Sequence, residues 1–372
     1  MSLEFWLHIP FFHPDLSRPY KDLVSEVVDM VQAAEDLGFE GVVVPENNFN
    51  NFIVNPSSLQ FIGLLAGRTS RIRFLSGVLV LPTHNPLILA GQVALADHMT
   101  DGRLSVGVAR GGGPYMGDRL GFDGRLSREM YEESLAVMKR LWTEYDVSHD
   151  GRFWSFPETT VLPRPLQDPY PELWVAAQTE QGLTDAGRQG LNLLTSPSLG
   201  SFAPHGDLDR AIASFRAGSA ETGVTPGKAM VMRHMWIDED DERALEHLDE
   251  AYHHWSHYAS GATTRPDVEN ADRLAARDAR SGWDRRQRVI RGGRMIPASI
   301  EIDRDDIATR YDDPILLGAE NAIERFAHYE EIGVDAVACL LAMGAPIEEI
   351  IRSMEVIASR VMPSFTASEV PA

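Results

Sequence analysis

Eight short apolar segments, each followed by a longer amphipathic stretch, constrain the fold of this chain more than any other feature. In residues 20–37, for example, apolar side chains recur at helical spacing until Gly38, a residue type that commonly ends helices. Alternating strands and helices are typical of α/β folds with a parallel sheet. The strands are predicted at residues 4–9, 40–44, 72–81, 104–109, 173–177, 191–195, 229–237 and 335–341.

Two parallel architectures fit this pattern, an open doubly wound sheet and a closed (β/α)8 barrel, the TIM barrel. An open nucleotide-binding sheet usually has a glycine-rich first turn, whereas the first turn here, residues 10–14, contains no glycine. We therefore predict one TIM-barrel domain over residues 1–372. Two predicted insertions interrupt the alternation: residues 143–171, rich in proline and aromatic residues, and residues 260–313, a lid-like segment rich in arginine and aspartate.

The charge of the chain excludes several classes of function. With 34 Lys and Arg against 55 Asp and Glu, the formal net charge is −21. Nucleic acids and anionic membranes require a basic surface, so we expect neither as a partner. The single cysteine, Cys339, cannot form an intramolecular disulfide. The sequence shows no signal-peptide pattern and no apolar run near the ~20 residues of a spanning helix, and we expect a cytoplasmic protein.

The catalytic groups of TIM barrels lie at the carboxyl ends of the strands, so those positions are the candidates. The second strand is followed by Glu46, Asn47 and Asn48, which either bind a polar heterocycle or form a simple turn. In the third strand, Gly77 either admits a flat ligand or marks a bulge. His84 follows a turn proline and is expected to satisfy local backbone groups.

Two other strand ends suit a phosphate group. After the fourth strand, Arg110 precedes three glycines, which places a positive side chain beside a flexible backbone. After the fifth strand, Thr179 is a candidate helix N-cap, and the first amides of a helix bind anions. Each motif alone also fits an ordinary loop or a capped helix. Their occurrence together in one barrel favours a phosphate site.

One helical pattern has the spacing of a metal site. Asp249, His253 and His257 recur every four residues and share a helix face. Because no cysteine and no second cluster accompany them, we interpret this face as solvated and predict no metal site.

Several collinear segments resemble the bacterial luciferase-like family of flavin-dependent monooxygenases. They extend over nearly the whole chain, and their fixed order makes the resemblance specific. The segments are AEDLGF and VPENNF within residues 34–49, VLPTHNP at 80–86, DHMTDGR at 97–103, VARG at 108–111, and IIRSM and VMPSF within 350–365.

The resemblance implies a barrel that binds FMN. The flavin ring would lie over the third strand, where family members often have a non-prolyl cis peptide, here between Gly77 and Val78. The phosphate would be held by Arg110, by the Thr179 hydroxyl and by the amides that follow it. The residues expected to contact the cofactor are Asn48, Gly77, Val78, Arg110, Gly111, Tyr115, Gln178, Thr179, Glu180, Gln181 and Gly182.

The chain departs from the family where one or two histidines commonly follow the glutamate of the second strand. Here both positions are amides, Asn47 and Asn48, and an amide cannot act as an acid or base near neutral pH. Light emission is therefore not expected. The candidate catalytic residues are Asn47 as a hydrogen-bonding group, and His8 and His234 as proton donors provided that they face the carboxyl end of the barrel.

The resemblance implies a two-component monooxygenase. Reduced FMN would come from a separate flavin reductase, and O2 would oxygenate a small organic substrate, such as a ketone or aldehyde, through a flavin peroxide. A homodimer is expected. Two alternatives stay open: a deazaflavin-dependent hydride-transfer enzyme, and a non-catalytic flavin-binding subunit.

Overall fold

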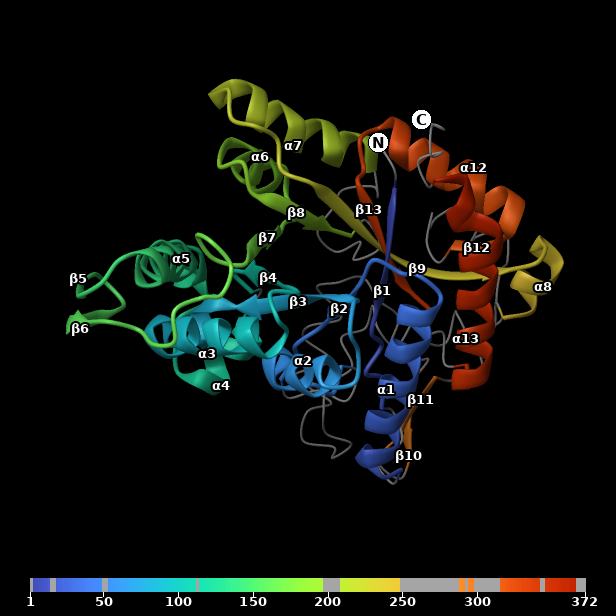
Figure 1. Ribbon diagram of the computed structural model, residues 1–372, viewed down its shortest axis with the longest axis horizontal. Helices are drawn as coiled ribbons and strands as arrows, with labels where there is room; N and C mark the ends of the chain where they lie inside the picture. Colours follow the sequence, from blue (N-terminus) through green and yellow to red (C-terminus); the bar gives the residue numbers. More distant parts are fainter. Residues whose placement is uncertain are drawn as a thin grey trace.

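The computed structural model shows a single closed barrel of parallel strands surrounded by helices (Figure 1). It describes residues 3–13, 18–48, 53–111, 114–196, 208–247, 288–291, 294–297, 315–341 and 345–365.

Eight strands form the barrel wall, and every neighbouring pair among them is parallel. The first strand pairs with the last and with the second, so the sheet has no free edge among these eight. The predicted TIM barrel is confirmed, and each predicted strand overlaps an observed one. The wall strands are β1 (Glu4–His8), β2 (Gly41–Val44), β3 (Arg73–Val80), β4 (Leu104–Ala109), β7 (Glu172–Ala176), β8 (Asn192–Thr195), β9 (Ala229–Asp238) and β13 (Ala336–Leu340).

Helices cover the outside of the barrel, as Figure 1 shows. None of the described helices is long and apolar enough to cross a membrane. The helices are α1 (Tyr20–Asp36), α2 (Ser58–Ala66), α3 (Pro86–Met99), α4 (Pro114–Leu120), α5 (Ser127–Thr143), α6 (Glu180–Arg188), α7 (Leu208–Thr222), α8 (Asp241–Glu246), α12 (Ala319–Glu331) and α13 (Ile347–Val356), with short turns η1 (Leu81–Thr83), η2 (Gly124–Leu126), η6 (Ile357–Val361) and η7 (Met362–Ser364).

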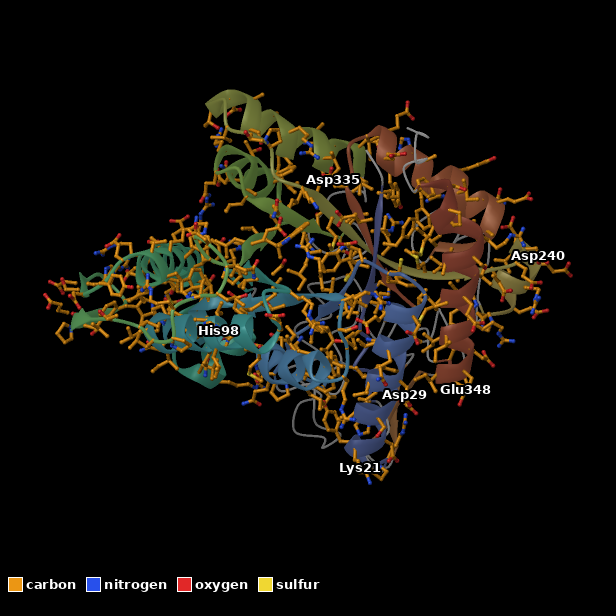
Figure 2. The ribbon with its side chains drawn as sticks, in the orientation of Figure 1. Lys21, Asp29, His98, Asp240, Asp335 and Glu348 are labelled. Carbon is orange, nitrogen blue, oxygen red and sulfur yellow. The ribbon has the colours of Figure 1, made fainter. Side chains whose placement is uncertain are left out.

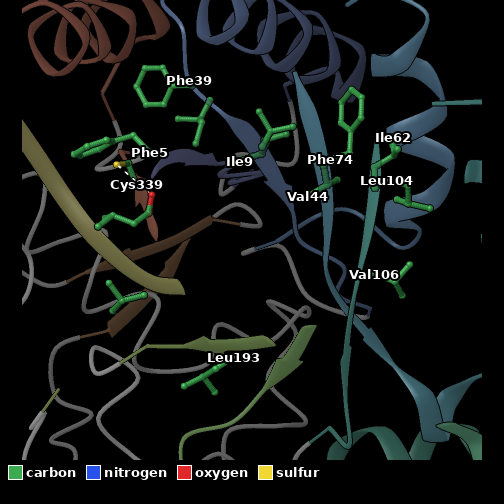
Figure 3. Packing of buried hydrophobic residues seen from close by; sticks show 14 of the residues in the cluster. Phe5, Ile9, Phe39, Val44, Ile62, Phe74, Leu104, Val106, Leu193 and Cys339 are labelled. Atoms are coloured by element: carbon green, nitrogen blue, oxygen red, sulfur yellow. Dashed lines mark hydrogen bonds between the residues drawn. The ribbon is translucent and has the colours of Figure 1, made fainter. Parts of the chain in front are cut away.

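Side chains alternate between the two faces of each strand, which divides the core into an outer and an inner part. Phe5, Phe74 and Val106 belong to the large outer cluster between the strands and the helices (Figure 3). Cys339 also lies in this outer cluster and is fully buried. The inner cluster fills the barrel and consists of Trp6, Val43, Leu75, Trp174, Leu194, Met230, Met232, Ala336, Ala338 and Leu340.

An ion-pair network closes the amino-terminal end of the barrel. Lys228 Nζ lies 2.7 Å from Glu4 Oε1, and Arg73 Nη2 lies 3.1 Å from Glu172 Oε2. The Trp6 indole donates to the other Glu4 oxygen at 3.1 Å. Burial is the largest single influence on Lys228 and opposes its charge, but the hydrogen bond to Glu4 and the charges of Glu4 and Glu172 together raise the pKa of the lysine above its usual value. In TIM barrels the catalytic groups lie at the opposite, carboxyl end.

The predicted insertion at 143–171 contains an antiparallel hairpin of β5 (Val147–Asp150) and β6 (Ser155–Thr159). In the second predicted insertion, the structure describes only another antiparallel pair, β10 (Arg288–Arg291) and β11 (Arg294–Pro297). The rest of residues 260–313 lies outside the described residues.

Some of the observed elements were not predicted from the sequence. β12 (Ile315–Gly318) pairs with Met235 to Asp238, because β9 continues past the point where β13 ends. α4 begins at Pro114, directly after the glycine-rich stretch that suggested a flexible loop. The helix predicted over 242–258 begins at Asp241, and its part beyond 247 lies outside the described residues, as do Asp249, His253 and His257.

Candidate active site

The ends of β4 and β7 place Arg110 beside the start of α6. The two strands are parallel neighbours with Val108 opposite Val175, so the loops that follow them are adjacent. Arg110 is exposed, and no carboxylate lies within ion-pair distance of it in the part of the chain that the structure describes. The Arg110 side chain is therefore available to bind an anion.

The first turn of α6 presents backbone amides at the same place. Thr179 is the N-cap, as predicted, and its Oγ1 accepts the Gly182 N–H at 3.2 Å. The side chains of Glu180 and Gln181 are engaged elsewhere, with Arg210 and Asp185 respectively. Their backbone N–H groups have no acceptor among the described residues. These two groups therefore remain available to an anion.

The end of β3 adjoins this anion site. The predicted cis peptide between Gly77 and Val78 is confirmed, and the pairing of β3 with β4 shifts register at the same point, so the bulge interpretation also holds. Val78 packs against the inner cluster. Gly111 has φ +69°, and a Cβ there would lie 2.5 Å from Val80 Cγ1, so the loop after β4 lies against β3.

For two of the predicted cofactor contacts, the structure gives position in the chain but no hydrogen bond. Gln178 follows β7 and is half-buried. Tyr115 lies in α4, and its side chain is outside the described residues. Gln178 directly precedes Thr179 in the chain, and Tyr115 lies five residues after Arg110.

Asn47 forms a local turn at the end of β2. Its N–H donates to the Asn55 carbonyl at 2.9 Å, and its side-chain oxygen accepts the Asn48 N–H at 2.8 Å. Asn55 is buried and donates to the Pro45 carbonyl at 2.7 Å. The side-chain oxygen of Asn47 is therefore used in a turn, as one of the two interpretations expects. The side chain of Asn48 is half-buried and has no hydrogen-bond partner among the described residues.

Glu46 and His84 meet at the ends of β2 and β3. His84 Nε2 lies 3.1 Å from Glu46 Oε1, whereas the sequence suggested only backbone partners for this histidine. The other Glu46 oxygen accepts both the N–H and the hydroxyl of Ser58. Sequence reasoning missed this contact because 38 residues separate the partners.

His8 and His234 both face the interior of the barrel at its carboxyl end. His8 lies two residues beyond the inward-facing Trp6, and His234 pairs with the inward-facing Leu340. His8 is 5% exposed and His234 is fully buried. Nδ1 of His8 has no hydrogen-bond partner in the described part of the chain.

Burial lowers the pKa of His8 from 6.5 to about 4, because removal from water disfavours the imidazolium form. His8 is therefore neutral near pH 7. It can accept or donate a hydrogen bond there, but it does not supply a proton as an imidazolium.

This shift predicts a specific acid sensitivity. The unfolded chain takes up a proton on His8 below about pH 6.5, while the folded chain does so only near pH 4, so stability present above pH 6.5 is lost as the pH falls. Between pH 7.5 and 5, wild type should lose about 2 kcal/mol more free energy of unfolding than His8→Gln. Urea unfolding at both pH values measures the difference. The same pH dependence in both proteins would contradict the buried neutral state.

Comparison with known proteins identifies the class of protein that this barrel represents. The family model for "Luciferase-like monooxygenase" matches residues 3–336. The chain belongs to this family, and the predicted flavin-dependent monooxygenase is confirmed at that level.

Individual relatives extend over the full length of the chain. The oxygenase component of a flavin-dependent trigonelline monooxygenase from Acinetobacter baylyi is 27% identical over 361 residues, which cover 94% of this chain and 92% of the relative. The oxygenating constituent of 3,6-diketocamphane monooxygenase from Pseudomonas putida, solved with FMN, has a TM-score of 0.75 at 18% identity, with 98% of this chain and 99% of that chain covered. An F420-dependent secondary alcohol dehydrogenase has a TM-score of 0.69 at 17% identity, with 99% and 100% covered. At these identities, the two structures show the shared fold.

Proposed function

We propose that this protein is the oxygenase component of a two-component FMN-dependent monooxygenase. It would receive reduced FMN from a separate flavin reductase and use O2 to oxygenate a small organic substrate, such as a ketone or aldehyde. The relative from Acinetobacter baylyi is named as an oxygenase component, and a structural neighbour holds FMN, which supports both parts of the proposal. The observation that carries it is Arg110 beside the open first turn of α6.

The donor set at this place fits the phosphate of FMN. A guanidinium binds phosphate oxygens through paired N–H groups, and the amides at a helix start add further donors. Arg110 has no competing carboxylate among the described residues, and the side chains of Glu180 and Gln181 are held away from the amides. The Thr179 hydroxyl caps α6 and lies at the same turn.

Bound FMN would supply the redox chemistry with O2, and the residues of the chain would position it. Val78 and the inner cluster offer an apolar floor, which excludes water from beneath a flat ring. Asn48 and Gln178 supply amides for its polar edge. His8 adds a neutral hydrogen-bonding group, and Asn47 contributes no acid or base.

Isotope labelling tests the proposed reaction. The protein, a flavin reductase, NADH and FMN would be incubated under ¹⁸O2 with trigonelline, cyclic ketones and long-chain aldehydes as probes. We expect one probe class to gain one oxygen atom from O2, the other atom leaving as water. A product labelled only from water, or hydride transfer from reduced deazaflavin or to oxidised deazaflavin, would contradict the proposal and favour the deazaflavin alternative. Absence of flavin binding would favour a non-catalytic subunit.

We also propose a homodimer that associates through α2 and α3. Ile88, Leu95 and Met99 on α3 are 61%, 51% and 53% exposed and share one helix face. Leu64 on the adjacent α2 is 38% exposed. An apolar face of this kind on a soluble domain is typical of an interface.

The dimer proposal predicts the behaviour of a double variant. Ile88→Glu with Leu95→Glu should raise the dissociation constant of the dimer by about 100-fold or more, because two buried charges would face each other without partners. Light scattering after size exclusion measures the mass. Leu245→Glu, at a 44% exposed position on α8, should remain dimeric. A monomeric wild type, or a dimeric double variant, would contradict this interface.

We place the protein in the cytoplasm, where the reduced nicotinamide that a flavin reductase consumes is available. Fractionation of cells that express the full chain tests this location.

A further inference from the structure

The contact between Glu46 and His84 lies outside the proposed phosphate site but at the same end of the barrel. Glu46 follows β2, and His84 follows η1 at the end of β3; β2 and β3 are parallel neighbours. The carboxylate and the imidazole are 3.1 Å apart. His84 therefore follows the strand that contains the cis peptide at Gly77 and Val78, and Glu46 follows the neighbouring strand.

Glu46 is held in one orientation. Its side chain is only 5% exposed, and Oε2 accepts the Ser58 N–H at 2.9 Å and the Ser58 hydroxyl at 3.0 Å. Oε1 is left for His84 Nε2. Because a carboxylate only accepts hydrogen bonds, Nε2 carries the hydrogen and Nδ1 carries the lone pair of the neutral ring.

The other edge of the His84 ring is available to a ligand. The side chain is 26% exposed, and Nδ1 has no hydrogen-bond partner among the residues that the structure describes. An imidazole fixed by a carboxylate at one nitrogen and open at the other is oriented for proton transfer. The other polar groups here are less suited to that purpose, because Asn47 and Asn48 are amides and burial lowers the pKa of His8 to about 4, which makes it a weak base.

We propose that His84, oriented by Glu46, is the proton-transfer group of this active site. Its Nδ1 takes a proton from an O–H or N–H group of the bound reactants, which gives an imidazolium that Glu46 stabilises. The same proton is then returned to the product or to water, so the ring ends unchanged. His84 thus takes over the role that the amides after Glu46 cannot fill. This inference rests on the proposed oxygenase function.

A chemical probe tests the position of His84 independently of activity. Diethyl pyrocarbonate acylates an unprotonated imidazole nitrogen, and mass spectrometry of the peptides gives the rate at each histidine. FMN at about ten times its Kd should slow modification of His84 by about tenfold. The control is His98, an exposed histidine on α3 whose Nε2 lies 2.9 Å from the Arg164 carbonyl; its rate should not change.

A probe reaction tests the chemical role. Protein loaded with reduced FMN and mixed with O2 yields H2O2, with the two electrons and two protons of the reduced flavin passing to O2. His84→Gln retains a hydrogen-bonding side chain for Glu46 but transfers no proton, and should lower the rate of H2O2 release by about 100-fold. Free imidazole should restore much of the rate in His84→Ala. Glu46→Gln should lower the rate by about tenfold, because it only positions the ring.

The outcomes separate this inference from the proposed function. The inference is overturned if FMN binds but does not protect His84, if His84→Gln releases H2O2 at a near-normal rate, and if imidazole does not rescue His84→Ala. A wild-type protein that binds no FMN in either redox state contradicts the proposed function, and the role of His84 falls with it.

Discussion

Replacement of Arg110 by alanine should raise the dissociation constant of reduced FMN by about 100-fold, since it removes about 3 kcal/mol of charge-assisted hydrogen bonding. The size of the effect follows from the surroundings. Arg110 has no ion-pair partner among the described residues, so the free protein loses nothing that would offset the missing phosphate contact. Arg110→Lys should retain the charge but not the paired donors, and should weaken binding by about tenfold.

The matched control for Arg110 is Arg125, which lies in η2 after the same strand. Its side chain is 90% exposed, and its one ion pair among the described residues is with Asp123, two positions away. Arg125→Ala should leave FMN affinity unchanged. Fluorescence titration of all three variants in low and high salt gives the affinities, and the effect of Arg110 should shrink as salt screens the charge. Affinity within twofold of wild type for Arg110→Ala would remove this residue from the phosphate site.

Replacement of Asp97 by alanine should lower the free energy of unfolding by about 3 kcal/mol. Asp97 lies on α3 with no exposed surface. Its carboxylate accepts the N–H groups of Leu166 and Gln167 at 2.8 and 2.9 Å, and the Gln167 amide at 2.7 Å. These three hydrogen bonds attach the end of the 143–171 segment to the barrel. Alanine leaves the two backbone N–H groups without their acceptor, and the Gln167 amide keeps only its hydrogen bond to the Leu104 carbonyl.

Urea unfolding measures the loss at Asp97. The control is Asp29, an exposed residue on the outer side of α1 (Figure 2), where alanine should change stability by less than about 0.5 kcal/mol. A loss below about 1 kcal/mol for Asp97→Ala would show that the segment is held by other contacts.

The sequence predicted the barrel because each wall strand is a run of apolar residues between helical patterns. β9 is an example, since most of its ten residues are apolar and all of them are buried. β12 escaped prediction because it pairs with the part of β9 that extends beyond the end of β13, which no local pattern indicates. α4 escaped because its first residue, Pro114, follows glycines that normally indicate a loop.

The sequence predicted those parts of the candidate site that depend on residues close together in the chain. The N-cap at Thr179 depends on residues three positions apart, and the cis peptide at Gly77 followed from the family resemblance. The partner of His84 was not predictable, because that contact depends on the pairing of β2 with β3. Nor did the sequence indicate that burial would keep His8 neutral.

In the proposed function, the carboxyl end of this barrel binds reduced FMN and directs its reaction with O2. Anaerobic titration of the full chain with FMN, reduced FMN and reduced deazaflavin, followed by rapid mixing of the reduced FMN complex with O2, tests it most directly. We predict tight binding of reduced FMN, weaker binding of the deazaflavin, and an absorbance course that differs from that of free reduced FMN. No binding of either form of FMN, or a course identical to that of free flavin, would contradict the claim.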